Sequence, residues 1–237
     1  MKIRTVFLAL ALWLTVAPAA DTEKTATGDL VITPVRHGSV MLQWGGQVIH
    51  VDPWSKGDYS SLPRADYIII TDLHGDHMDK GIVDKLKKES TVIVAPAAVA
   101  KTILEVQVIA NGERKKFGPI EVEAVPMYNL QRGPQPGALY HTKGRGNGYV
   151  LTLGGKRVYF SGDTEAVPEM KALKSIDIAF LCMNLPYTMT PEEAAGAAKA
   201  FRPKIVYPYH YQGQDPKAFA GLLKDEKGIE VRLREWY

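Results

Sequence analysis

Residues 72–77, with the sequence DLHGDH, carry four side chains that can bind a metal ion, two aspartates and two histidines. They come directly after an apolar run at 67–70, which is typical of a buried strand. Two imidazoles and two carboxylates at a strand end gain little from burial, whereas one or two divalent cations would pair all four. A solvated polar loop is the alternative. Because loops at strand ends often carry catalytic residues, the segment favours a metal site.

Two further potential ligands also follow predicted strands. Asp163 lies in the Gly-Asp-Thr segment 162–164, after an apolar run at 157–161, and His210 ends a run at 205–209. Asp163 has an alternative interpretation as a turn residue, and His210 has one as a buried core histidine. Their positions at strand ends favour the ligand interpretation for both.

The composition limits which side chains could hold a metal. Cys182 is the single cysteine of the 237 residues, which excludes an internal disulfide and every zinc site with two or more thiolates. Any metal must therefore be bound by His, Asp and Glu. The length suits one domain, and the chain has 46% hydrophobic and 23% charged residues. These fractions are typical of a globular protein rather than a disordered or coiled-coil chain.

The first twenty residues predict a secretory signal peptide. Lys2 and Arg4 precede an apolar run at 6–16, and Ala-Pro-Ala at 17–19 is a cleavage signal. The run is shorter than the ~20 residues of a membrane-spanning helix, so we expect cleavage, no stable membrane anchor, and export to the periplasm or the medium. Loss of Lys2 and Arg4 lowers the net charge from +3 to +1, which argues against nucleic-acid binding. Residues 21–237 are expected to form a single domain, whose oligomeric state the sequence leaves open.

The order of predicted elements is strands first, then alternating strands and helices. A polar linker is expected at 21–28, Asp79 is predicted to cap one helix, and Thr190 with Glu193 forms a capping box for another. This order predicts an α/β or α+β sandwich. Strands are predicted at 31–35, 40–44, 47–51, 67–70, 91–95, 106–110, 120–125, 148–153, 157–161, 176–181, 204–207 and 229–233, and helices at 97–104, 166–173, 191–201 and 216–224.

The spacing of residues 72–77 resembles the H-x-H-x-D-H motif of the metallo-β-lactamase superfamily, with aspartate in the place of the first histidine. Three other segments are similar to that family in the same chain order: VDPW at 51–54, YFSGDT at 159–164 and YPYH at 207–210. The compact branch that includes L-ascorbate-6-phosphate lactonase and N-acyl-phosphatidylethanolamine phospholipase D resembles this chain most.

The resemblance implies a four-layer αβ/βα sandwich with two divalent metal ions, most often zinc and sometimes manganese or iron, at one edge of its sheets. It implies these ligands: Asp72 and His74 for the first metal, Asp76, His77 and His210 for the second, and Asp163 bridging both. A metal lowers the pKa of bound water from about 15.7 toward ~7, which makes a nucleophile at neutral pH. Asp76 and Asp163 are thus expected to act in catalysis.

Two departures from the family pattern concern the first metal. Asp72 supplies an anionic oxygen where the family has a neutral imidazole, which shifts the preference toward manganese or iron. The family's middle histidine is missing from residues 126–129. His141 is expected to replace it from a loop, and otherwise Tyr128 or Asn129 would face the metal. With His141 as the ligand, Tyr128 and Asn129 are expected to contact substrate.

Other polar residues are expected to support the site. Asp52 is predicted to accept a hydrogen bond from a ligand such as His74, and His37 either supports a ligand or serves turn chemistry. Lys143 and Arg145 share a glycine-rich loop and could pair with a substrate phosphate or carboxylate. A solvated loop face is the alternative for these two charges.

Three functional hypotheses remain at this stage. The first is a metal-dependent hydrolase that uses a metal-bound hydroxide on an ester, lactone, phosphodiester or amide of a small molecule. The second is a β-lactamase, which the export signal favours and the missing histidine disfavours. The third is a non-enzymatic metal- or partner-binding protein on the same fold. Metal content together with turnover would distinguish them.

Overall fold

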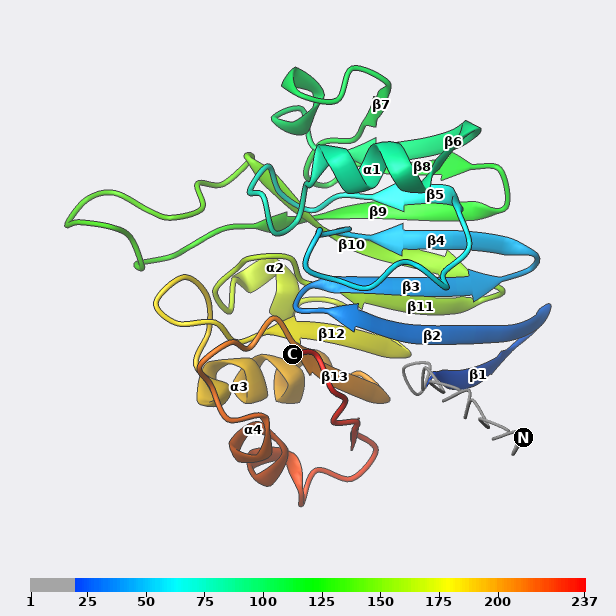
Figure 1. Cartoon of the computed structure of the whole chain (residues 1–237). Coiled ribbons are helices and arrows are strands. Elements are labelled where there is room, and N and C mark those ends of the chain that lie inside the picture. The colour runs from blue at the N-terminus through cyan, green and yellow to red at the C-terminus, as the bar shows by residue number, and fades with distance from the viewer. Residues whose placement is uncertain (1–19) are drawn as a thin grey trace, which may run out of the picture.

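The computed structural model describes residues 20–237, which form two seven-stranded sheets packed face to face, with helices on the outer sides (Figure 1). The predicted signal peptide lies almost entirely outside the described residues. No helix within 20–237 has the length and apolar character needed to cross a membrane. The four-layer sandwich expected from the sequence is confirmed.

Each sheet keeps its strands in chain order. The first sheet contains β1 (Asp21–Thr25), β2 (Gly28–Arg36), β3 (Ser39–Trp44), β4 (Gln47–Val51), β5 (Ala65–Ile69), β6 (Lys87–Ala95) and β7 (Val106–Val108). The second contains β8 (Arg114–Phe117), β9 (Ile120–Met127), β10 (Gly146–Leu153), β11 (Lys156–Phe160), β12 (Ile178–Cys182), β13 (Ile205–Tyr209) and β14 (Glu230–Val231).

The two sheets share one strand pattern. In the first, β1 to β4 pair antiparallel and β4 to β7 pair parallel. In the second, β8 to β11 pair antiparallel and β11 to β14 pair parallel. Because parallel strands end at the same edge of a sheet, the loops after β4, β5, β11 and β13 are brought together there.

Burial on both faces explains why the end of β5 and the residue after it, Ile70, form a continuous apolar run. Ile69 points into the core between the sheets, whereas Ile68 and Ile70 point outward into a second apolar cluster. That outer cluster is closed by α1 (Lys80–Leu86), which contributes Ile82 and Val83. A strand covered on both faces does not need to alternate apolar and polar residues. The continuous apolar segment at 67–70 is therefore a reliable sign of this strand.

Local capping places the helices where the sequence predicts them. Asp79 caps α1 by accepting from the backbone N–H groups of Gly81 and Ile82, and Thr190 with Glu193 forms the capping box of α3 (Pro191–Phe201). The second sheet is covered on its outer side by α3 together with α2 (Pro168–Lys171) and α4 (Pro216–Leu223) (Figure 1).

Two element predictions are wrong, and one strand was not predicted. The expected linker at 21–28 contains β1, because Asp21–Thr25 pairs with β2 in an edge hairpin. The expected helix at 97–104 is reduced to one 3-10 turn, Val99–Lys101. The strand β8 was not expected, because its sequence RKKF shows no alternation of apolar and polar residues. It forms a mostly exposed edge strand that pairs with β9.

Candidate metal centre

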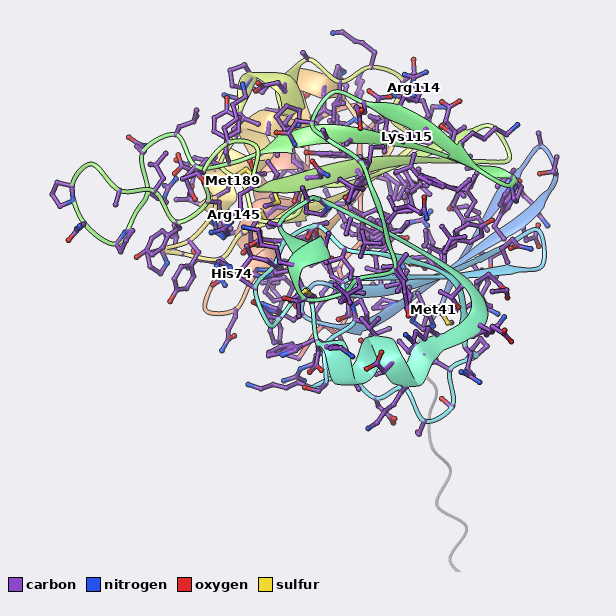
Figure 2. All side chains as sticks on the ribbon, turned by 90° about the horizontal axis from the view of Figure 1, so that it is seen from above. Met41, His74, Arg114, Lys115, Arg145 and Met189 are labelled. Atoms are coloured by element: carbon purple, nitrogen blue, oxygen red, sulfur yellow. The ribbon has the colours of Figure 1, made fainter. Side chains whose placement is uncertain are left out.

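The polar residues predicted as ligands gather at one edge of the two sheets. Figure 2 shows His74 and Arg145 at this end of the molecule, opposite to Met41 of β3 and Lys115 of β8. The strand ends deliver Asp52 after β4, Asp72 after β5, Asp163 after β11 and His210 after β13.

Three histidine side chains converge on the carboxylate of Asp163. Its Oδ1 lies 3.3 Å from Nε2 of His210. Its Oδ2 lies 3.4 Å from Nε2 of His77 and 3.3 Å from Nε2 of His141. Asp76 joins the group from the other side, because its Oδ2 is 3.4 Å from Nε2 of His210.

This geometry fits a bound metal better than a set of hydrogen bonds. Nitrogen and oxygen ligands about 2.1 Å from a tetrahedral zinc lie roughly 3.4 Å from one another. Within residues 20–237, Nε2 of His77, His141 and His210 and Oδ1 of Asp163 are buried without any hydrogen-bond partner. Buried polar atoms without partners are costly, and a divalent cation would satisfy all four.

The electrostatics of the cluster also favour a cation. Burial alone would lower the pKa of His77, but the carboxylates of Asp163 and Asp52 raise it well above its usual value. Burial alone would raise the pKa of Asp163, but His210 and His77 hold it well below its usual range. A proton on Nε2 of His77 and a metal ion therefore compete for the same position beside Asp163.

Asp52 orients His77. Its buried Oδ2 lies 2.8 Å from Nδ1 of His77 and accepts from the Thr71 hydroxyl at 2.6 Å, while Oδ1 accepts from the Thr71 backbone N–H at 2.7 Å. The hydrogen bond to Nδ1 leaves Nε2 of His77 facing Asp163 as an acceptor for metal. The sequence suggested His74 as the partner, and the structure gives His77 instead, because β4 and β5 pair in a register that sets Asp52 beside Thr71.

Asn129 orients the ring of His141 in the way that Asp52 orients the ring of His77. Its Oδ1 lies 2.7 Å from Nδ1 of His141 and accepts from the His141 backbone N–H at 2.8 Å. The amide nitrogen of Asn129 donates to Glu165 and to the carbonyl of Tyr187. His141 thus reaches the centre from its loop, while Asn129 lies behind it and is not in the cleft.

Asp72 has a different partner from the other carboxylates. The guanidinium of Arg145 donates to both of its oxygens, at 3.1 Å from Nε and 2.6 Å from Nη2. Oδ2 of Asp72 also lies 3.1 Å from Nδ1 of His74. Asp72, His74 and His141 are close enough to share one ion.

His37 contacts the opposite side of the centre. Its Nδ1 lies 2.7 Å from the hydroxyl of Tyr237, and its Nε2 lies 3.3 Å from Oδ2 of Asp76. Burial lowers the pKa of His37 to about 4, so the ring is neutral near pH 7. With Asp76 and His210 it forms another group that could hold an ion.

Three polar residues of the site have left-handed backbone conformations. The φ angles of His37, Asp52 and His210 are 54°, 44° and 47°. This conformation costs a non-glycine residue about 1–2 kcal/mol. The backbone N–H of His210 donates to the carbonyl of His37, and that of Asp52 donates to the carbonyl of Ile69, so hydrogen bonds hold these turns.

An open cleft of about 430 Å³ leads to the centre. Aromatic and neutral amide side chains make up much of its wall beyond the metal-ligand candidates, and Tyr140 and Tyr187 pack edge to face with ring centroids 5.0 Å apart. Within the described residues, neither lysine nor arginine lines this cleft. The lining comprises His37, Trp54, His74, Asp76, Tyr140, His141, Asp163, Asn184, Tyr187, His210 and Gln212.

Comparison with protein families gives this geometry a context. A family model described as a β-lactamase superfamily domain matches residues 31–210. The chain belongs to the metallo-β-lactamase superfamily. It is 32% identical over 217 residues to a UPF0173 metal-dependent hydrolase of Geobacillus sp. (strain WCH70), covering 84% of this chain and 95% of that relative. It is also 32% identical over 211 residues to a UPF0173 metal-dependent hydrolase of Thermus thermophilus, covering 82% of this chain and 91% of that relative.

Solved structures agree with the superfamily assignment. A candidate metal-dependent hydrolase from Parabacteroides distasonis ATCC 8503 is 45% identical, with a TM-score of 0.87 and coverage of 93% of this chain and 100% of that one. A metallo-hydrolase from Ignicoccus hospitalis, 22% identical with a TM-score of 0.72, shares the fold over 87% of this chain and 95% of its own.

Besides Asn129, two more residues expected to contact substrate, Lys143 and Tyr128, lie outside the cleft. Lys143 donates to Glu169 at 2.6 Å and lies over the ring of Tyr128, whose hydroxyl also donates to Glu169. Neither side chain lines the cleft, because this ion pair holds both on the outer side of the loop. The sequence analysis missed Tyr140 and Gln212 as cleft residues, and no motif marks them.

Proposed function

We propose that this member of the superfamily hydrolyses uncharged carbonyl compounds, namely esters, lactones or amides, at a divalent metal centre. The observation that supports this most is a cluster of buried atoms without hydrogen-bond partners, Nε2 of His77, His141 and His210 around the Asp163 carboxylate, beside the cleft that His141, His210 and Asp163 help to line. Structural ion pairs alone would leave no such unpaired imidazoles.

The residues would hold two metal ions, with Asp163 between them. His77 and His210, which group with Asp163, would bind one together with Asp76, whose Oδ2 lies 3.4 Å from Nε2 of His210. Asp72, His74 and His141 would bind the other. Imidazole nitrogens favour zinc, which we propose as the main ion, while the additional carboxylates also suit manganese or iron. When bound, such ions polarise a carbonyl and provide hydroxide from water near neutral pH.

The chain's own residues orient this chemistry. Asp52 and Asn129 hold the ring nitrogens of His77 and His141 so that Nε2 of each faces inward. His37 contacts Asp76 and is itself anchored by the hydroxyl of Tyr237. Within the described residues neither Asp76 nor Asp163 pairs with a lysine or arginine, so both carboxylates remain available to offset the charge of the ions.

The cleft wall favours a neutral substrate over a phosphodiester. Lys143 and Arg145, the two cations of the loop that carries His141, are paired with Glu169 and Asp72 and do not line the cleft. Since no lysine or arginine lines the cleft within the described residues, an anionic substrate would have only the bound ions to pair with. Tyr140, Tyr187 and Trp54 instead offer aromatic surface to an acyl group.

A substrate panel tests this function. The zinc-loaded protein should hydrolyse 4-nitrophenyl butyrate and a simple γ-lactone, lose that activity on treatment with a chelator, and regain it with zinc. Turnover of bis(4-nitrophenyl) phosphate should be lower, and turnover of a chromogenic cephalosporin would favour the β-lactamase alternative. A zinc-loaded protein without activity on any ester, lactone or amide would contradict the proposal.

Binding of zinc at pH 7 is expected to release about one proton per centre. His77 has a raised pKa without metal, so it carries a proton below that pKa and loses it when zinc binds. Zinc affinity and activity should consequently increase with pH along an acid limb. Calorimetric titrations of zinc in buffers with different ionisation enthalpies measure the proton number, and an unchanged heat across buffers would contradict it.

Variants at the neighbouring residues Asn129 and Tyr128 provide a matched comparison of zinc affinity. Asn129→Ala removes the acceptor that orients His141, so the zinc held by His141 should bind ~10-fold or more weakly. Tyr128→Phe removes only a hydroxyl bonded to Glu169 and should leave zinc binding unchanged. Zinc titration against a competing chelator measures both, and the reverse order of effects would argue against this role of Asn129.

We further propose that residues 1–20 direct export and that 21–237 act as one hydrolase domain outside the cytoplasm, on a small-molecule substrate. The proposal is supported by the basic start, the apolar run and the cleavage signal in the sequence. N-terminal sequencing of protein recovered from the periplasm or medium tests it, and an intact Met1 in a cytoplasmic fraction would contradict it.

A further inference from the structure

Asp72 has both carboxylate oxygens engaged. Arg145 donates from Nε to Oδ1 at 3.1 Å and from Nη2 to Oδ2 at 2.6 Å, the paired geometry in which a guanidinium binds carboxylate most strongly. The side chain of Asp72 is fully buried, so water does not weaken this ion pair. An ion approaching Oδ2 must share it with a group that is already positive.

The backbone holds Arg145 in this position. The Asn147 N–H donates to the carbonyl of Thr71 at 2.9 Å, which joins the start of β10 to the end of β5. A Cβ on Gly146 would lie 2.9 Å from that carbonyl oxygen, so only glycine allows this approach without a shift of the backbone. Nη1 of Arg145 also donates to the carbonyl of Tyr140. The guanidinium is therefore fixed beside Asp72.

The two metal positions differ in charge and in burial. Asp76 and Asp163 together balance one divalent ion, and the side chains of His77 and His210 are each only 1% exposed. At the other position the charge of Asp72 is already balanced by Arg145, and the side chain of His74 is 43% exposed. A second ion there would have only the Asp163 carboxylate, shared with the first ion, to offset its charge.

We propose that Arg145 makes the centre unequal: it occupies the carboxylate of Asp72 and keeps the position formed by Asp72, His74 and His141 at low metal affinity. The position formed by Asp76, His77, Asp163 and His210 then fills first and holds its ion tightly. This inference rests on the proposed metal centre. It assigns Arg145 to metal affinity rather than to binding of an anionic substrate.

Metal removal in steps tests the proposal without any need for a substrate. Full-length protein loaded with zinc is dialysed against increasing concentrations of a chelator, and the zinc-to-protein ratio is measured by mass spectrometry. The wild type should lose one zinc early and keep the other. Arg145→Met should retain its second zinc up to a free chelator concentration at least ~10-fold higher than the wild type does. The reason is that the substitution frees the negative charge of Asp72 for the metal.

Lys143→Met is the matched control, because Lys143 lies two residues away and pairs with Glu169 on the outer side of the loop. It should lose zinc as the wild type does. If Arg145→Met does not fold, Arg145→Gln removes the same charge and keeps a donor for Asp72, with the same expected gain. Loss of both zinc ions in one step from the wild type, or an unchanged profile in the Arg145 variants, would overturn the inference. A wild type that binds no zinc would overturn the metal centre itself.

Discussion

Replacement of Asp163 by asparagine is expected to remove most bound zinc and to lower hydrolysis at least ~1000-fold. The carboxylate lies within 3.4 Å of Nε2 of His77, His141 and His210, so it is shared by both proposed metal positions. An asparagine amide has one neutral oxygen and presents N–H donors where two acceptors are needed. Metal content by mass spectrometry and ester hydrolysis at saturating substrate measure the two effects.

Asp177→Asn is the control for this variant. Asp177 is a largely buried carboxylate of the same sheet, and it accepts from the backbone N–H of Arg157 and from Lys204, away from the cleft. Its loss should change stability and leave zinc content and activity near wild-type values. If Asp163→Asn kept its full zinc complement, Asp163 would not be a ligand, and the centre would have to be rebuilt around the remaining histidines.

The second large effect is expected for Asp52→Asn, which should lower zinc affinity and activity at least ~100-fold. Asparagine can still accept from the Thr71 backbone, but its amide would then donate toward Nδ1 of His77. That reversal places the imidazole proton on Nε2, the atom that must bind the metal. The variant should therefore fold normally, but His77 would present a protonated Nε2 that cannot bind the metal.

Asp66→Asn provides a comparison with similar local bonding. Asp66 also accepts a backbone N–H, that of Val48, and pairs with Lys88, but it touches no histidine. Thermal unfolding of both variants, with and without zinc, separates stability from metal binding. Zinc should raise the melting temperature of Asp66→Asn as in the wild type and that of Asp52→Asn much less. An equal rise in both would show that Asp52 does not orient a ligand.

The fold was predictable where local physics and tertiary packing agree. The apolar run at 67–70 indicates a strand covered on both faces, and the capping box at Thr190 marks the start of α3 at the correct residue. The strand β8 was not predictable, because RKKF gains its structure from pairing with β9 and buries almost nothing. Edge strands of this kind depend on a neighbour that the local sequence does not reveal.

The site was predictable to the extent that its residues end strands. Asp163 and His210 follow apolar runs, so their convergence follows from parallel pairing alone. The partners of His141 and Asp72 were not predictable, since Asn129 and Arg145 depend on the path of the loop between β9 and β10. Arg145 meets Asp72 across 73 residues of chain, a pairing that only the contact between the two sheets determines.

The left-handed backbone at His37, Asp52 and His210 has a consequence for protein engineering. Glycine would adopt these φ angles without steric cost, so a procedure that minimises backbone strain alone would favour glycine at three positions that this chain uses for polar function. Designs based on this fold would then relieve the strain and lose the metal centre together. These three backbone angles offer a simple filter: a stabilised variant that has replaced any of them by glycine should be rejected before its activity is assayed.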